Sequence, residues 1–188
     1  MQQEEKSFNE MQTVKRHFFA LRNGVIADVL RKGGCPYRII FGLNLPQIVE
    51  TAAETPHSRE LAERLWANTT TRESMLLAPM LVDRDDFTID GALRWIESMP
   101  DSAETADVLC HRLLRHLPYA LELAGLLSDA RRDIEVYTGL RLMANLVYSH
   151  PSEAKAYAET YLAAHDGSDA PHARLARQII DEADFVNS

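Results

Sequence analysis

Residues 58–82 have the sequence SRELAERLWANTTTRESMLLAPMLV, and this stretch decides the fold class. Its apolar residues recur at helical spacing in two short runs, which the polar segment NTTT separates. Ser58 is placed to cap the first helix, and Thr70 with Glu73 has the spacing of a capping box for the second. Because helices this short cannot bury an apolar face as an isolated pair, the stretch predicts a stack of similar pairs.

The rest of the chain follows the same pattern. Almost every apolar stretch has helical spacing, and we expect residues 37–41 to form an extended connector rather than a strand. Further helix starts are indicated by cap residues, namely Asn44 with Pro46, Thr88, Asp101 with Glu104, Asp133, Ser152 and Asp169. The sequence therefore predicts an all-α fold in which residues 1–188 form one HEAT-like helical repeat domain. Its architecture would be a curved stack of HEAT/armadillo-like antiparallel helix pairs, an α-α superhelix of about ten short helices.

A weak internal repeat supports this interpretation. The tripeptide at residues 60–62, Glu-Leu-Ala, recurs at residues 122–124. At the same offset Leu65 matches Leu127, and Glu73 matches Glu135. The offset spans about two helix pairs, as stacking of related units requires.

Composition and charge restrict the function. The 188 residues carry a formal net charge of -8, which is unlike the basic face typical of nucleic-acid binders, and only four of the twenty cationic residues are Lys. The two cysteines, Cys35 and Cys110, have no CxxC spacing and are expected to be reduced thiols. The polar start of the chain and the lack of a long apolar run predict a cytoplasmic protein without a membrane span.

From about residue 23 to residue 146, the chain resembles the HEAT-like DNA alkylation repair family, the alkylpurine DNA glycosylases. The resemblance rests on the order of short motifs. They are Tyr37, Phe41-Gly42-Leu43 before Leu45-Pro46, Glu60-Leu61-Ala62 with Leu65-Trp66, Arg72-Glu73 with Leu76-Leu77-Ala78, Arg94-Trp95-Ile96, Thr105-Ala106-Asp107 and Thr138-Gly139-Leu140-Arg141-Leu142.

The resemblance implies a concave cradle that follows the DNA backbone and an enzyme that removes cationic alkylated bases. It places the catalytic carboxylate on Asp107, whereas Ala103 stands where the family has a Trp. The family's Arg falls near Tyr137 or Thr138, with Arg141 one helical turn further on. The glycosylase residue set is thus largely missing, and we expect weak or no base release. From the residues alone, Asp107 can equally be a carboxylate favoured by the dipole at the start of its helix.

Five arginines form the best candidate for DNA binding. On adjacent helices they could share one face and contact phosphates: Arg112, Arg115, Arg131, Arg132 and Arg141. The alternative is a solvated face with ion pairs to neighbouring acidic residues, namely Glu122, Asp129, Asp133 and Glu135. No metal site is expected, because His111 and His116 are five residues apart instead of the i, i+4 spacing of a helical zinc site, and no cofactor motif is present.

Two functions are compatible with these residues. The first is binding of duplex DNA, with or without base excision. The second is a non-catalytic scaffold that uses its concave face for a protein partner. The acidic charge and the missing Trp and Arg favour this scaffold over a catalytic role, whereas the family resemblance favours DNA binding.

Overall fold

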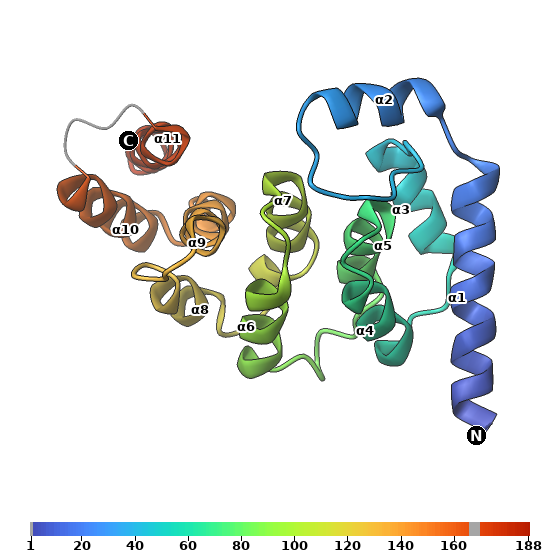
Figure 1. The fold of residues 1–188 in the computed structure, drawn as a ribbon. Coiled ribbons are helices and arrows are strands. Elements are labelled where there is room, and N and C mark those ends of the chain that lie inside the picture. The colour runs from blue at the N-terminus through green and yellow to red at the C-terminus, as the bar shows by residue number, and fades with distance from the viewer. Residues whose placement is uncertain (1, 166–169) are drawn as a thin grey trace. The chain divides into compact units, whose positions relative to one another are not determined.

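The computed structural model describes residues 2–165 and 170–188, with side chains from residue 10 onward. These residues form eleven α-helices and two short 3-10 helices, and their one β-type contact is an isolated bridge between Ile39 and Thr71. The prediction of an all-α fold is confirmed (Figure 1). The expected cap at Asp169 lies outside the described residues.

The chain divides into two compact units. Unit 1 comprises residues 2–87 and 98–105, and unit 2 comprises residues 88–97 and 106–188. The end of helix α6 and the first turn of helix α7 therefore belong to unit 1. A single domain over the whole chain stays a prediction.

Unit 1 is built from five α-helices and the 3-10 helix η1. Their bounds are α1 Gln2–Ala20, α2 Gly24–Lys32, α3 Leu45–Glu54, α4 Arg59–Ala67, α5 Arg72–Leu77 and η1 Ala78–Met80. Helix α4 packs against α1, α5 and η1, and α3 packs against α5. Leu61, Ala62 and Leu65 of α4 are fully buried, as their helical spacing in the sequence predicts.

The caps of unit 1 are partly those that the sequence predicts. Ser58 accepts a hydrogen bond from the Leu61 backbone N–H, and Asn44 forms a reciprocal capping box with Gln47. The predicted box of Thr70 with Glu73 is wrong, because helix α5 begins after Thr71, which makes no side-chain cap. Glu73 points instead into the interior of unit 1, where more distant donors bind it.

The predicted caps at Asp101, Asp133 and Ser152 are also wrong. Asp133 is the first residue of its helix, and Ser152 lies inside a helix that begins at Pro151. The Ser102 hydroxyl accepts the hydrogen bond from the Thr105 backbone N–H at 3.3 Å, so Ser102 has the capping role at the start of α7. Glu104, the expected box partner, extends to Arg72 in α5. For the two predicted capping boxes, a buried arginine or backbone donor from another segment binds the glutamate that local spacing assigns to the box.

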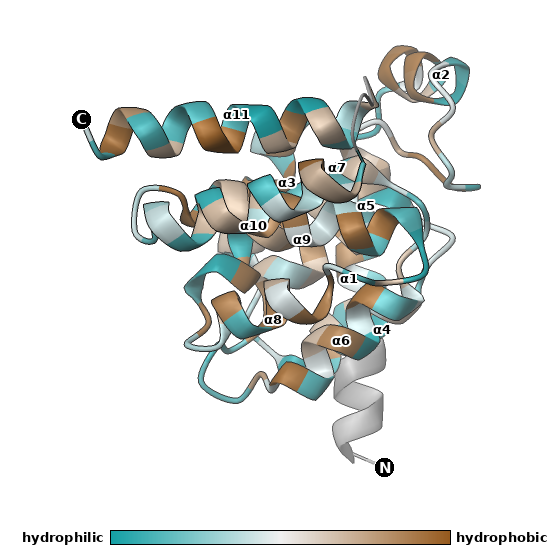
Figure 2. Cartoon of the chain, turned by 90° about the vertical axis from the view of Figure 1, so that its left-hand side faces the viewer, coloured by the Kyte–Doolittle hydropathy of each residue, from teal (hydrophilic) through white to brown (hydrophobic). Residues whose placement is uncertain are grey.

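Unit 2 contains the other helices. Their bounds are α6 Ile89–Ser98, α7 Ala103–Arg112, η2 Leu114–His116, α8 Ala120–Leu126, α9 Asp133–Leu146, α10 Pro151–Ala164 and α11 Pro171–Val186. Helix α9 is central, since it packs against η2, α8, α10 and α11. Figure 2 shows hydrophobic and hydrophilic residues alternating along α11, whose inward residues include Ala176 and Ile179, both fully buried.

Gly139 allows a close approach of helices α9 and α10. A Cβ at this position would lie 2.4 Å from the Tyr157 hydroxyl oxygen and 3.1 Å from the Leu127 Cβ. The missing side chain therefore gives the Tyr157 ring room to reach between α8 and α9.

The repeat predicted from the sequence falls on equivalent helices of the two units. Residues 60–62 lie on α4 and residues 122–124 on α8, and in each unit the next α-helix, α5 or α9, packs against it. Leu123 is as fully buried in unit 2 as Leu61 is in unit 1. The described part of the chain contains no helix long and apolar enough to cross a membrane.

Candidate functional site

The carboxylate of Asp107 lies in a small polar cluster on unit 2, between helices α7 and α9. The Tyr137 hydroxyl donates a hydrogen bond to Oδ1 of Asp107 at 2.8 Å. One turn further along α9, Nε of Arg141 lies 2.6 Å from the same oxygen, and the guanidinium donates a hydrogen bond from Nη2 to the Tyr137 hydroxyl oxygen at 3.0 Å. Spacing of i, i+4 places Tyr137 and Arg141 on one face of α9, where both reach Asp107.

The ion pair between Asp107 and Arg141 has a short distance between Nε and Oδ1 but no hydrogen bond at Nε. The Nε–H group of Arg141 does not point at the carboxylate, so the contact lacks hydrogen-bond geometry in spite of the short distance. The side chains are 43% and 31% exposed respectively, which leaves part of each within reach of a ligand. The Arg141 guanidinium also lies 5.6 Å from the centre of the Tyr137 ring, within the range of a cation–π contact.

The pKa shifts of Arg141 and Tyr137 keep these two groups in their ordinary charge states. Burial alone would lower the pKa of Arg141, but the hydrogen bond to Tyr137 and the charge of Asp107 outweigh it, and the net shift is upward. The pKa of Tyr137 is also raised, chiefly by burial. At neutral pH Arg141 is therefore a cation and Tyr137 a neutral hydrogen-bond donor.

Further polar and aromatic contacts extend the cluster along α9. His111, one turn after Asp107, lies 3.2 Å from the Asn145 side-chain oxygen, measured from Nδ1. In the other direction the Tyr137 ring meets His172 of α11 edge-on, with ring centres 5.4 Å apart. We call Asp107, His111, Tyr137, Arg141 and His172 the polar row of unit 2. These contacts join side chains of α7 and α11 to α9.

The arginines predicted to bind DNA occupy different places on unit 2. Arg141 belongs to the polar row, whereas Arg132, at the N-cap of α9, donates a hydrogen bond to the Glu97 carbonyl at 2.6 Å. Arg132 also lies 3.7 Å from Glu135, one of the acidic partners that the sequence suggests for the solvated alternative. Arg131, beside it, is exposed.

Arg112 lies toward the end of α9 opposite Arg132. Arg112 is the last residue of α7, next to the His111–Asn145 contact, and Arg115 lies in η2, where it donates to His116 at 3.1 Å. Because α9 has fourteen residues, this end lies about 20 Å from Arg132. The five arginines therefore do not form one compact patch.

A second cluster of charges occurs in unit 1, and it is buried. Glu73, with no exposed surface, accepts hydrogen bonds from the Phe41 and Gly42 backbone N–H groups at 3.0 and 2.9 Å. Arg72, 4% exposed, donates to Glu73, to Glu104 and to the Leu43 carbonyl. Burial lowers the pKa of Arg72, but Glu104 and Glu73 more than compensate and raise it. These contacts fix the connector between α2 and α3, so the Arg72-Glu73 and Phe41-Gly42-Leu43 motifs are parts of one structural unit.

Sequence reasoning assigns no DNA-binding role to three members of the polar row. Tyr137 is a position near which the family's Arg falls, His111 enters only the rejected zinc spacing, and His172 has no role. A signal for Tyr137 was available, since Tyr137 and Arg141 share a face of the predicted helix. Nothing local in the sequence indicates His172, which lies on a helix two elements away.

A metal site has no support among the described residues, which contain no group of three or more His, Cys, Asp or Glu side chains arranged to hold an ion.

Comparison with known proteins identifies the family. No curated protein matches the chain. A solved structure described as "A new family of proteins related to the HEAT-like repeat DNA glycosylases with affinity for branched DNA structures" is 17% identical, with a TM-score of 0.64 over 92% of this chain and 83% of that chain. At this identity the likeness shows the fold, and it confirms the predicted HEAT-like class. The family described as DNA alkylation repair enzyme matches residues 14–128, more than half of the sequence. The chain therefore belongs to the DNA alkylation repair enzyme family, as a divergent member.

Proposed function

We propose that this protein binds DNA through the polar row of unit 2 and has little or no base-excision activity. The observation that carries the proposal is the part-exposed Arg141, held on α9 between the Asp107 carboxylate and the Tyr137 hydroxyl. Membership of the DNA alkylation repair enzyme family supports a DNA ligand. The structural relative, whose description gives it affinity for branched DNA, supports testing branched as well as duplex DNA.

Arg141 is suited to a phosphate contact. Its guanidinium keeps its charge and its side chain is 31% exposed, so its terminal N–H groups can donate to a phosphate oxygen, whereas Nε is buried beside Asp107. Tyr137 and Asp107 hold the side chain along α9 before DNA arrives. Arg112 toward one end of the helix, and Arg131 toward the other, would add weaker phosphate contacts.

Base excision is disfavoured by the same contacts. A glycosylase carboxylate must stabilise positive charge that develops on the sugar and base, so its own charge has to face the substrate. Asp107 is instead paired with Arg141 at 2.6 Å and accepts the Tyr137 hydrogen bond. Ala103, one turn earlier on α7, offers no aromatic face for a cationic base. Asp107 would therefore act mainly on the position of Arg141.

The proposal can be tested by fluorescence anisotropy with labelled duplex and three-way-junction DNA at about 50 and about 200 mM salt. We expect binding that weakens steeply with salt, because released counterions drive it. Arg141→Met should weaken binding about tenfold, and the number of counterions released on binding should fall by about one. Arg31→Met, which removes the same charge from an exposed Asp28 pair in unit 1, is the matched control and should change little.

The Asp107→Asn variant distinguishes a carboxylate that positions Arg141 from one that catalyses base release. If Asp107 only positions Arg141, removal of the Asp107 charge should tighten DNA binding by roughly a few-fold, because the carboxylate no longer repels the DNA phosphates. Release of 7-methylguanine from methylated DNA should be weak or absent with the wild type. Clear release that Asp107→Asn abolishes would show that Asp107 is catalytic, and absence of DNA binding at low salt would disprove the DNA proposal itself.

A protein-interaction scaffold is the second candidate function, and charge is the observation that favours it. Unit 2 carries nine Lys and Arg residues against fourteen Asp and Glu residues. Two of the arginines, Arg132 and Arg141, already have partners within the unit. Lack of binding to both DNA forms, with a folded protein, would favour this alternative over DNA binding.

A further inference from the structure

Tyr148 continues the side of helix α9 that carries Tyr137 and Arg141. The residues on this side follow one another at helical spacing: Tyr137, Arg141, Asn145 and Tyr148. The helical turn persists past the end of α9, because the His150 backbone N–H donates to the Leu146 carbonyl, four residues back, at 2.8 Å. Tyr148 therefore lies one turn beyond Asn145 on the same side of the helix.

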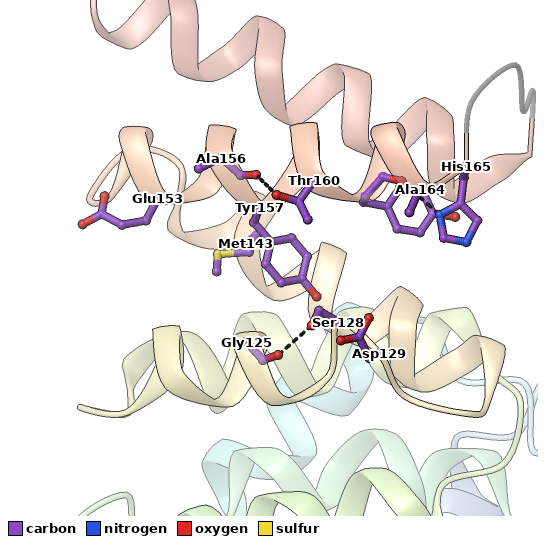
Figure 3. A pocket seen from close by; sticks show the side chains of 11 residues that line it. Gly125, Ser128, Asp129, Met143, Glu153, Ala156, Tyr157, Thr160, Ala164 and His165 are labelled. Carbon is purple, nitrogen blue, oxygen red and sulfur yellow. Dashed lines mark hydrogen bonds between the residues drawn. The ribbon is translucent and has the colours of Figure 1, made fainter.

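The ring of Tyr148 is exposed, unlike the other tyrosine rings of unit 2. The Tyr137 and Tyr161 rings pack against histidine rings, and Tyr119 is part-buried. Tyr157 extends across a pocket of about 360 Å³ between helices α8, α9 and α10 (Figure 3). Tyr148 is 72% exposed and has no ring contact or hydrogen bond within the described part of the chain. Its aromatic surface is therefore available to a ligand.

Arg141 and Tyr148 are separated by a distance that suits a nucleic-acid strand. Seven residues of helix advance about 10 Å along the axis. One strand of DNA advances about 3.4 Å per nucleotide. When a strand runs along α9 with a phosphate on Arg141, a base about three nucleotides away lies at the level of Tyr148. Arg112 follows His111, which contacts Asn145, and adds a cation near this stretch.

A base can stack on an exposed tyrosine only where it has left its base pair. In a continuous duplex, the neighbouring bases cover both faces of each base. In a gap, an unpaired base can turn outward and place one face on an aromatic side chain. Such stacking tolerates any sequence, because every base has a π face, and it requires no alkylated or charged base.

We propose that Tyr148 stacks with an unpaired, unmodified base, so that the protein binds gapped DNA in preference to continuous duplex. This inference rests on the proposed DNA binding by the polar row. It adds the feature of the DNA that is preferred and the residue that recognises it. Arg141 holds the backbone through its charge, whereas Tyr148 supplies the preference through its ring.

The test compares two labelled DNAs by fluorescence anisotropy at about 50 mM salt. One is a continuous duplex, and the other is the same duplex with a gap of about three nucleotides in one strand. We expect the wild type to bind the gapped DNA about tenfold more tightly, as stacking of one base on an aromatic side chain predicts. Tyr148→Ala should abolish this preference and leave the affinity for continuous duplex unchanged, whereas Tyr148→Phe, which keeps the ring, should retain it.

A second measurement reports the stacking itself. The fluorescence of 2-aminopurine placed in the gap depends on how this base stacks. Binding of the wild type and of Tyr148→Phe should therefore alter the emission in the same way, and binding of Tyr148→Ala should not. Phe185→Ala is the matched control, because it removes a ring that is 78% exposed on α11 and lies outside the polar row. This variant should bind both DNAs like the wild type.

Three results would overturn the inference and leave the proposed DNA binding intact, provided that continuous duplex still binds through Arg141. They are equal binding of the two DNAs by the wild type, an unchanged preference in Tyr148→Ala, and an equal loss of preference in Phe185→Ala. Absence of binding to both DNAs would disprove the proposed function and this inference with it.

Discussion

The arginine–carboxylate clusters of the two units show how similar chemistry takes on different roles. In unit 1 Arg72 and Glu73 are buried, and their partners include the backbone groups of Phe41, Gly42 and Leu43. In unit 2 Asp107 and Arg141 are part-exposed and contact only side chains. A buried charged side chain that is hydrogen-bonded to backbone groups is needed for the fold to be stable. A part-exposed ion pair, in contrast, can still contact a ligand. The comparison predicts that substitutions in the first cluster alter stability and those in the second alter binding.

The largest effect is expected for Glu73→Leu. It removes the acceptor of the Phe41 and Gly42 N–H groups and leaves the buried Arg72 with one carboxylate fewer. The free energy of unfolding in urea should fall by about 3–5 kcal/mol. Glu104→Gln changes a 41% exposed partner of Arg72 and should lower the free energy of unfolding by clearly less. Equal losses of unfolding free energy in Glu73→Leu and Glu104→Gln would show that burial of the carboxylate does not determine its contribution to stability.

Gly42→Ala should have the next largest effect. Gly42 has a φ of 81°, and a Cβ there would lie 2.1 Å from the Asn23 carbonyl oxygen and 2.8 Å from the Ala27 nitrogen. Backbone strain alone costs about 1–3 kcal/mol, and the clash with rigid backbone adds to it. Gly24→Ala is the matched control, since no atom lies within 4 Å of its Cβ position, and urea unfolding should show little change. A tolerated Gly42→Ala would mean that the connector can move away from α2.

Asp107→Asn and Arg141→Met should change stability much less than Glu73→Leu does. Exposed ion pairs contribute about 0.2–1 kcal/mol because solvent screens them and the side chains lose entropy when they pair. Urea unfolding of the two variants should therefore stay within about 1 kcal/mol of the wild type. A loss as large as that of Glu73→Leu would place the Asp107 cluster among the folding determinants and would weaken its proposed role in DNA binding.

The smallest expected effect is a difference in reactivity between the thiols of Cys35 and Cys110. Cys35, in the connector of unit 1, is partly exposed, while Cys110, on α7 one turn from Asp107, is fully buried. Burial, and then the charge of Asp107, raise the pKa of Cys110, so its thiolate fraction stays low at neutral and mildly alkaline pH. In a thiol titration with an aromatic disulfide reagent, Cys35 should react within minutes and Cys110 only after denaturation. Cys35→Ser should leave no fast-reacting thiol, and rapid reaction of a second thiol in the native wild type would show that α7 opens readily.

Long segments with strong periodicity were predictable from the sequence. The helices over residues 58–82 and their buried leucines follow from apolar residues at helical spacing, and Ser58 and Asn44 cap as predicted. Asp107 could be singled out through the family resemblance. The boundaries at Thr70 and Asp101 could not be predicted, because their glutamates bind partners that come from other segments.

The sequence by itself determined the helical class, most helix positions and the family, since these depend on local spacing and on the order of motifs. Only the tertiary structure decided which charges are buried and which are accessible. Residues 58–82 illustrate the division: their periodicity specified two helices, but the fold turned Arg72 and Glu73 inward to fix the connector before α3. The reason is that a carboxylate or guanidinium takes its role from the groups it meets across the fold, and those groups lie about thirty residues away in the chain.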